Sequence, residues 1–173
     1  MKVILVCGVI GSGKDYFVKK YRREHPNEIV EEKKFAWPIR QFTGRLVGVN
    51  LLNETTYESW KADPKNRQLL VDVGQYMKEA TTEDIWAIAV LNQLTEDKTY
   101  IISDFRFPVE YKTICSKHRA TIHFCNYKSA RYLVNPNQIS EKLACFLVSK
   151  GFEDNQEFTC SEFDKLINEF EGK

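Results

Sequence analysis

The sequence has no long apolar run, and this absence argues against a membrane protein. No run reaches the ~18 residues that a membrane-spanning helix needs. The apolar run at the N-terminus is short and leads straight into glycines, so it lacks the form of a secretion signal. We therefore expect no membrane partner and a cytoplasmic location.

An excess of charge of one sign is missing as well. The chain has 25 lysines and arginines against 24 aspartates and glutamates, which leaves a formal net charge of +1. No broad basic field is present to attract nucleic acid, and we expect no nucleic-acid partner. Any binding of an anion must depend on a local group of residues.

Metal-ligand and nucleophile patterns are absent too. The three histidines have no metal-ligand spacing, and no Ser-His-Asp or Cys-His arrangement suggests a hydrolase. The five cysteines form no C-x-x-C pair and lie in apolar stretches, as buried free thiols do in a reducing compartment. They are Cys7, Cys115, Cys125, Cys145 and Cys160.

The sequence does have a strong signal at its start. Val3–Cys7 is an apolar, β-branched run that predicts a buried strand. A glycine-rich loop, Gly8–Lys14, follows at once, and a helix is expected from Gly13 to about Glu24. Strand, glycine loop and helix start form a phosphate cradle in which Lys14 would neutralise the β- and γ-phosphates of a nucleotide. The alternative is a glycine-rich turn that binds nothing.

The residue after the cradle lysine is unusual. Ser or Thr is expected there, because its hydroxyl helps to hold Mg²⁺, but the chain has Asp15. A carboxylate can hold the metal directly or through water. Alternatively, Asp15 is a feature of one subfamily, or the metal site is damaged.

A second signal is the apolar strand Thr99–Asp104, which ends in an acid. This pattern places the Asp104 carboxylate beside a phosphate site and its metal, although an aspartate there could also cap the next helix. Arg106 follows at the same strand end and is a candidate for stabilising transferred charge. Trp86 is either a core residue or part of a pocket wall, where its ring would stack on a nucleotide base.

Strands alternate with helices along the rest of the chain. The predicted fold class is therefore α/β, a P-loop three-layer sandwich with a mostly parallel sheet and helices on both faces. The secondary structure of residues 28–35 is ambiguous. Residues 48–63 are expected to form a loop or an irregular helix. Helices are expected over 38–47, 64–78, 82–94, 108–118, 139–150 and 161–171, and further strands over 120–126 and 157–159.

The motifs taken together resemble the bacteriophage deoxynucleoside monophosphate kinase family. The matching segments occur in the family's order and cover most of the chain. They are GVIGSGKD at 8–15, AWPIRQ at 36–41, NRQLLVDVG at 66–74, EDIWAIAV at 83–90, YIISDFRFPVEY at 100–111, ATIHF at 120–124 and QISE at 138–141.

This resemblance implies a single P-loop kinase domain over residues 1–173. It would transfer the γ-phosphoryl group of ATP, with Mg²⁺, to a deoxynucleoside monophosphate. A helical region over 38–95 would bind the acceptor. The polar stretch over 127–138, with Arg131, is our own assignment of a lid. The location would be the cytoplasm of the host cell, and a homodimer is left open.

The resemblance also assigns residues to roles. Binding of ATP falls by motif match to Gly8, Gly11, Gly13, Lys14 and Asp15, and we add Ser12 and Tyr16 from the same segment. The acceptor pocket is formed by Arg67, Trp86, Asp104, Arg106 and Glu110. The catalytic set is Lys14, Asp15, Arg106 and, as our own assignment, Arg131, with Asp15 and Asp104 at the metal.

Two departures limit the resemblance. The family often has Thr where this chain has Tyr16, and the chain is short before Asn66. We therefore make no prediction of the accepted base. The rival functions are a P-loop kinase of another small metabolite and an ATP-binding switch protein that transfers no phosphate.

Overall fold

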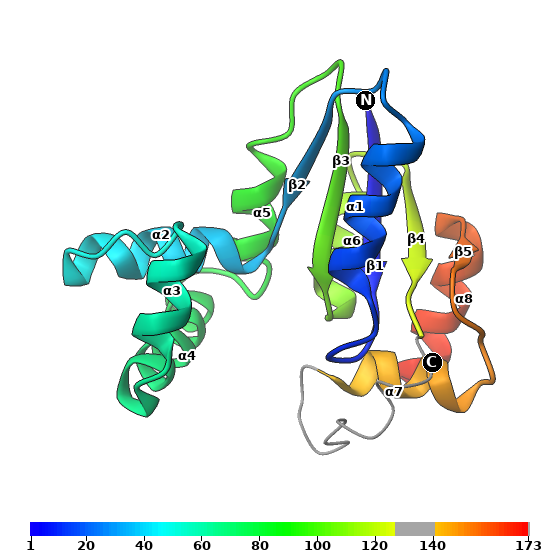
Figure 1. Cartoon of the computed structure of the whole chain (residues 1–173). Coiled ribbons are helices and arrows are strands. Elements are labelled where there is room, and N and C mark those ends of the chain that lie inside the picture. The colour runs from blue at the N-terminus through cyan, green and yellow to red at the C-terminus, as the bar shows by residue number, and fades with distance from the viewer. Residues whose placement is uncertain (127–140, 173) are drawn as a thin grey trace. The chain divides into compact units, whose positions relative to one another are not determined.

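The structure is a computed structural model that describes residues 1–126 and 141–172 (Figure 1). The predicted lid over 127–138, with Arg131, lies outside the described residues. None of the helices in the described part is long and apolar enough to cross a membrane.

The described residues form an α/β fold around one five-stranded sheet with the order β2-β3-β1-β4-β5. All neighbouring strands are parallel except β4 and β5, which are antiparallel. The strands are β1 (Lys2–Cys7), β2 (Val30–Lys33), β3 (Thr99–Phe105), β4 (Ala120–Phe124) and β5 (Gln156–Phe158). The prediction of a mostly parallel sheet is confirmed, and Val30–Lys33 resolves the ambiguous segment as an edge strand.

Eight helices accompany the strands in the described residues. Several begin at local signals: Asp63 caps α4 ahead of Pro64, and Thr159 caps α8 by accepting the Glu162 amide. The helices are α1 (Lys14–Glu24), α2 (Ala36–Val47), α3 (Glu54–Lys61), α4 (Pro64–Ala80), α5 (Ile85–Leu91), α6 (Pro108–Cys115), α7 (Lys142–Ser149) and α8 (Cys160–Phe170).

The chain divides into two compact units. Unit 1 contains Met1–Lys34 and the described residues from Leu94 onward, and therefore the whole sheet. Unit 2 is Phe35–Gln93 and contains the helices α2 to α5.

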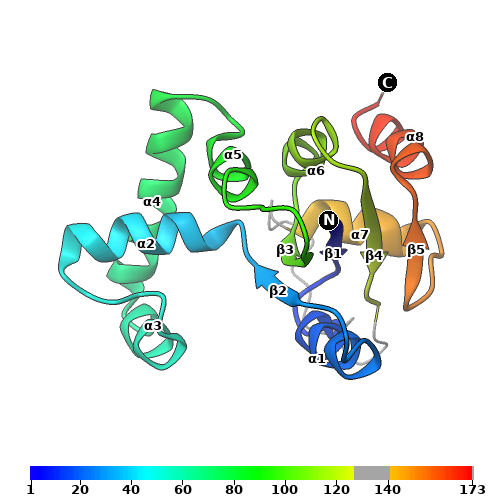
Figure 2. The ribbon, with the colours of Figure 1, turned by 90° about the horizontal axis from the view of Figure 1, so that it is seen from above.

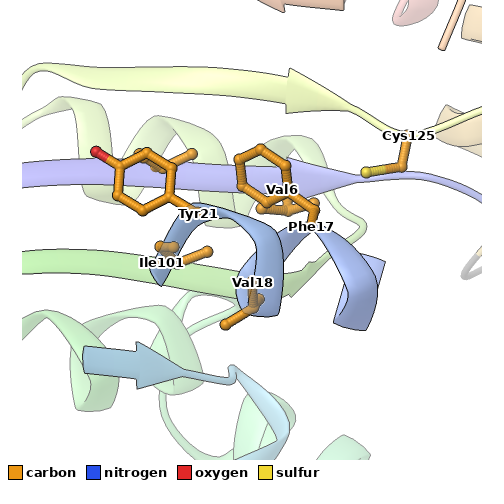
Figure 3. Close-up of a cluster of buried hydrophobic side chains, with 7 residues drawn as sticks. Val6, Phe17, Val18, Tyr21, Ile101 and Cys125 are labelled. Carbon is orange, nitrogen blue, oxygen red and sulfur yellow. The ribbon is translucent and has the colours of Figure 1, made fainter. Parts of the chain in front are cut away.

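Both faces of the sheet in unit 1 are covered by helices, an arrangement compatible with a three-layer sandwich (Figure 2). On one face, Phe17, Val18 and Tyr21 of α1 pack on Val6 and Ile101 in a buried cluster (Figure 3). On the other face, Phe105 contacts the rings of Tyr111 on α6 and Phe163 on α8. The resulting core fixes the strand ends from which the candidate site projects.

Candidate functional site

The loop between β1 and α1 has the backbone that its glycines predict. Gly11 and Gly13 have φ angles of 75° and 93°, in the left-handed region that favours glycine. Gly13 is the N-cap of α1, so the first amides of that helix, which have no intrahelical acceptor, open onto the loop. Backbone amides at a helix N-terminus suit an anion.

Gly8 is packed tightly against Ser12 and Cys125. A Cβ atom on Gly8 would lie 2.3 Å from Ser12 Oγ and 2.4 Å from the carbonyl oxygen of Cys125, so only glycine fits. The Ser12 side chain is buried, and its amide donates to the Val9 carbonyl. Ser12 therefore packs within the loop. A contact between Ser12 and ATP remains a prediction.

Lys14 bends back over the loop. Its ammonium donates to the carbonyl oxygens of Gly8, at 2.7 Å, and Val9, at 2.8 Å. Burial lowers the pKa of Lys14, and the positive charge of Arg106 lowers it further, whereas Cys7 and Glu141 act in the opposite direction. The loop thus holds a partly desolvated cation, whose attraction for a phosphate is stronger than that of a surface lysine.

The thiols beneath the loop stay neutral. The Cys125 amide donates to the Cys7 carbonyl, which ties the ends of β4 and β1 together. Burial raises the pKa of both thiols to about 12. They serve as apolar packing under the site rather than as nucleophiles.

Asp15 and Tyr16 lie at the surface. The side chain of Asp15 is 84% exposed and is 3.9 Å from the Lys34 ammonium, and Tyr16 is also exposed. Across residues 1–126 and 141–172, no group of three or more His, Cys, Asp or Glu side chains could hold a metal ion. A nucleotide-bound Mg²⁺ needs only one or two carboxylates beside phosphates and water, so this donor set fits that metal but not a protein-only cage.

The end of β3 lies beside the end of β1, as the sequence predicted. Phe105 pairs with Cys7 across the two strands, which places Asp104 and Arg106 next to the start of the glycine loop. Asp104 is half-buried in the last part of β3. The two strongest sequence signals therefore lie together at the carboxyl ends of β1 and β3.

Glu110 has a structural task that sequence reasoning did not assign. One of its carboxylate oxygens accepts the backbone amides of Arg106, at 2.9 Å, and Phe107, at 3.0 Å. Glu110 thereby fixes the turn from which the Arg106 side chain leaves. Its predicted contact with an acceptor substrate stays a prediction.

Glu141 is a site residue that the sequence analysis missed. Its buried carboxylate accepts the Ile10 amide of the loop at 3.0 Å and pairs with the Arg106 guanidinium at 3.3 Å. The only available signal was its place in the QISE segment, because an acid just before an apolar helix is usually a local helix-start residue.

The remaining predicted residues lie in unit 2. Trp86 on α5 is buried, and its indole donates to the Gly74 carbonyl of α4 at 3.0 Å, so it is a core residue of that unit. Arg67 is exposed on α4. Their contacts with an acceptor stay predictions.

Comparisons with protein-family models and with curated proteins found no match for this chain.

Proposed function

We propose that this chain is a nucleoside monophosphate kinase, which transfers the γ-phosphoryl group of ATP to a deoxynucleoside 5′-monophosphate. The single observation that supports this most is the meeting of Lys14 and Arg106 at a glycine loop. Lys14 follows β1 through the glycine loop and Arg106 follows β3, and these neighbouring strands are parallel. Ligands in open α/β sheets bind at the carboxyl ends of such strands.

The reaction needs mainly positive charge and alignment. Charge on the moving phosphoryl group is spread over its oxygens, so catalysis depends on fixed cations rather than on a covalent nucleophile. Lys14 would exchange its two loop carbonyls for phosphate oxygens, and Arg106 would stabilise the group in transfer. The neutral thiols of Cys7 and Cys125 offer no competing chemistry.

The metal has a limited role in this proposal. Mg²⁺, when bound with ATP, would neutralise charge on the β- and γ-phosphates, and Asp15 and Asp104 are the residues that would hold it. Asp15 is well exposed, which agrees with a metal that keeps most of its water.

The test is a coupled assay of ADP release with ATP, Mg²⁺ and each deoxynucleoside monophosphate in turn. Turnover with at least one acceptor is expected, and it should disappear in EDTA. If ATP binds measurably but no deoxynucleotide is phosphorylated, the proposal is wrong. Turnover only with a sugar acid or a coenzyme precursor would then identify a kinase of another metabolite, and none at all would favour a binding protein.

A further inference from the structure

We propose that Glu141 is a positioning residue of this site, which holds the glycine loop and Arg106 together in the arrangement that receives a polyphosphate. The identity of the ligand rests on the proposed function, whereas the positioning role rests on contacts within the chain.

Glu141 connects three segments that are far apart in the sequence. One carboxylate oxygen accepts the Ile10 amide of the β1–α1 loop, and the other accepts from the guanidinium of Arg106 after β3. The residue itself stands directly before α7. Only 3% of its side chain is exposed, while 35% of the Arg106 side chain is. A buried carboxylate with a separate donor on each oxygen has little freedom to rotate, so it fixes both donors.

The carboxylate does not serve its own helix. Glu141 is the N-cap residue of α7, but its side chain makes no capping hydrogen bond there. An acid at a helix N-terminus ordinarily gains stability from the first amides and the helix dipole. Here the side chain turns to the glycine loop instead, which a purely local role would not explain.

The charges around the carboxylate give the arrangement a reason. Lys14 donates to two carbonyl oxygens of the glycine loop that Glu141 holds through the Ile10 amide. Arg106 is ion-paired with the same carboxylate. A fixed counter-ion thus keeps two cations close together before a phosphate arrives, which lowers the reorganisation that binding would otherwise require.

The experiment compares Glu141→Gln, Glu141→Ala and the control Glu153→Gln, which changes an exposed glutamate. Glutamine keeps the volume and a carbonyl acceptor for Ile10 but removes the charge that pairs with Arg106. Hydrogen exchange of the Ile10 amide is measured on the whole protein without nucleotide.

In Glu141→Ala, exchange of the Ile10 amide should be about tenfold faster, because its acceptor is lost. In Glu141→Gln, this exchange should stay close to that of the wild type. Glu153→Gln should leave the exchange of the Ile10 amide unchanged. An exchange rate of Ile10 in Glu141→Ala equal to that of the wild type would overturn the proposal.

Turnover provides a separate readout. With an accepted substrate, Glu141→Gln should reduce kcat roughly tenfold while the KM for ATP stays within about threefold, since the carboxylate acts through Arg106. An equal kcat in Glu141→Gln and wild type would contradict the positioning role. The hydrogen-exchange readout needs no turnover, so failure of the kinase proposal would be seen separately from failure of this one.

Discussion

Lys14 is the residue on which the proposed chemistry most depends. Its ammonium is held by two carbonyl oxygens of its own loop, and phosphate oxygens are stronger partners for a desolvated cation. Lys14→Ala should therefore lower turnover by roughly a thousandfold, because charge that develops in transfer loses its nearest cation. ADP release measures this effect.

The matched control for this change is Lys19→Ala, which removes an exposed lysine from the same helix, α1. It should leave turnover within about twofold of the wild type. A Lys14→Ala variant that keeps more than about a tenth of the activity would be inconsistent with a cation acting on the transferred group.

His123 gives the fold a dependence on pH. Its ring stacks on Phe17 of α1 at 3.8 Å between centroids, and burial lowers its pKa, while Glu157, Asn155 and Asp154 partly oppose this shift. The unfolded chain therefore takes up a proton near pH ~6.5 that the folded chain resists. The free energy of unfolding should fall as pH drops below that value, until the pH passes below the pKa of the folded state.

His123→Phe should remove this component, because phenylalanine keeps a ring against Phe17 but cannot titrate. Urea denaturation at pH 7 and pH 5 tests it: the difference in unfolding free energy between the two should be smaller in the variant. The same difference in both proteins would show that His123 does not cause the effect.

At the scale of elements, two glycines should respond oppositely to alanine. A Cβ on Gly8 would collide with the Cys125 backbone, so Gly8→Ala should destabilise the protein by about 2 kcal/mol or more. A Cβ on Gly74, in the middle of α4, would lie at an ordinary 3.5 Å from Ile39. Gly74→Ala should therefore stabilise by up to about 1 kcal/mol through helix propensity. Chemical denaturation checks both, and equal effects would refute the steric argument.

We expect that a disulfide can form between the helices α6 and α8. Cys115 and Cys160 have sulfur atoms 3.1 Å apart, and both are free thiols. Oxidised glutathione should oxidise this pair to a disulfide. The two electrons and two protons of the thiols pass to glutathione, which leaves as two reduced molecules. Because burial raises the pKa of Cys115 to about 12, the reaction should be slow near neutral pH and rise roughly tenfold per pH unit. Intact mass and peptide mapping identify the bridge.

Cys145→Ser is the control, since it removes a different half-buried cysteine and should leave the bridge intact. Cys160→Ser should abolish it. A mixed disulfide with glutathione on Cys115, with no bridge in the wild type, would contradict the prediction.

Elements that depend on local signals were predictable from the sequence. The β1 run, the glycine loop and α1 follow one another without any help from distant residues, and Pro64 and Pro108 stand at the first positions of their helices. Strand β2 was ambiguous because Val-Glu-Glu-Lys has no clear apolar pattern, and it is a strand through its pairing with β3 about 70 residues later. Glu141 was missed for a similar reason: its two partners are 131 and 35 positions away.

At the scale of the whole molecule, the predicted residues are divided between the two units. The loop, Asp104, Arg106 and Glu110 belong to unit 1, and Arg67 and Trp86 belong to unit 2. The single kinase domain that the sequence suggested stays a prediction. This division nevertheless gives the kinase proposal a specific kinetic consequence.

If unit 1 binds ATP and unit 2 binds the acceptor, changes in the two units should affect different Michaelis constants. Arg67 is exposed on α4 and has a cation suited to an acceptor phosphate. Arg67→Ala should raise the KM of the accepted deoxynucleotide about tenfold and leave the KM for ATP within about twofold. Lys65→Ala, which removes an exposed cation from the same helix, should change neither constant. An equal rise in both constants with Arg67→Ala would mean that Arg67 does not distinguish the two nucleotides, and the assignment of unit 2 to the acceptor would then be wrong.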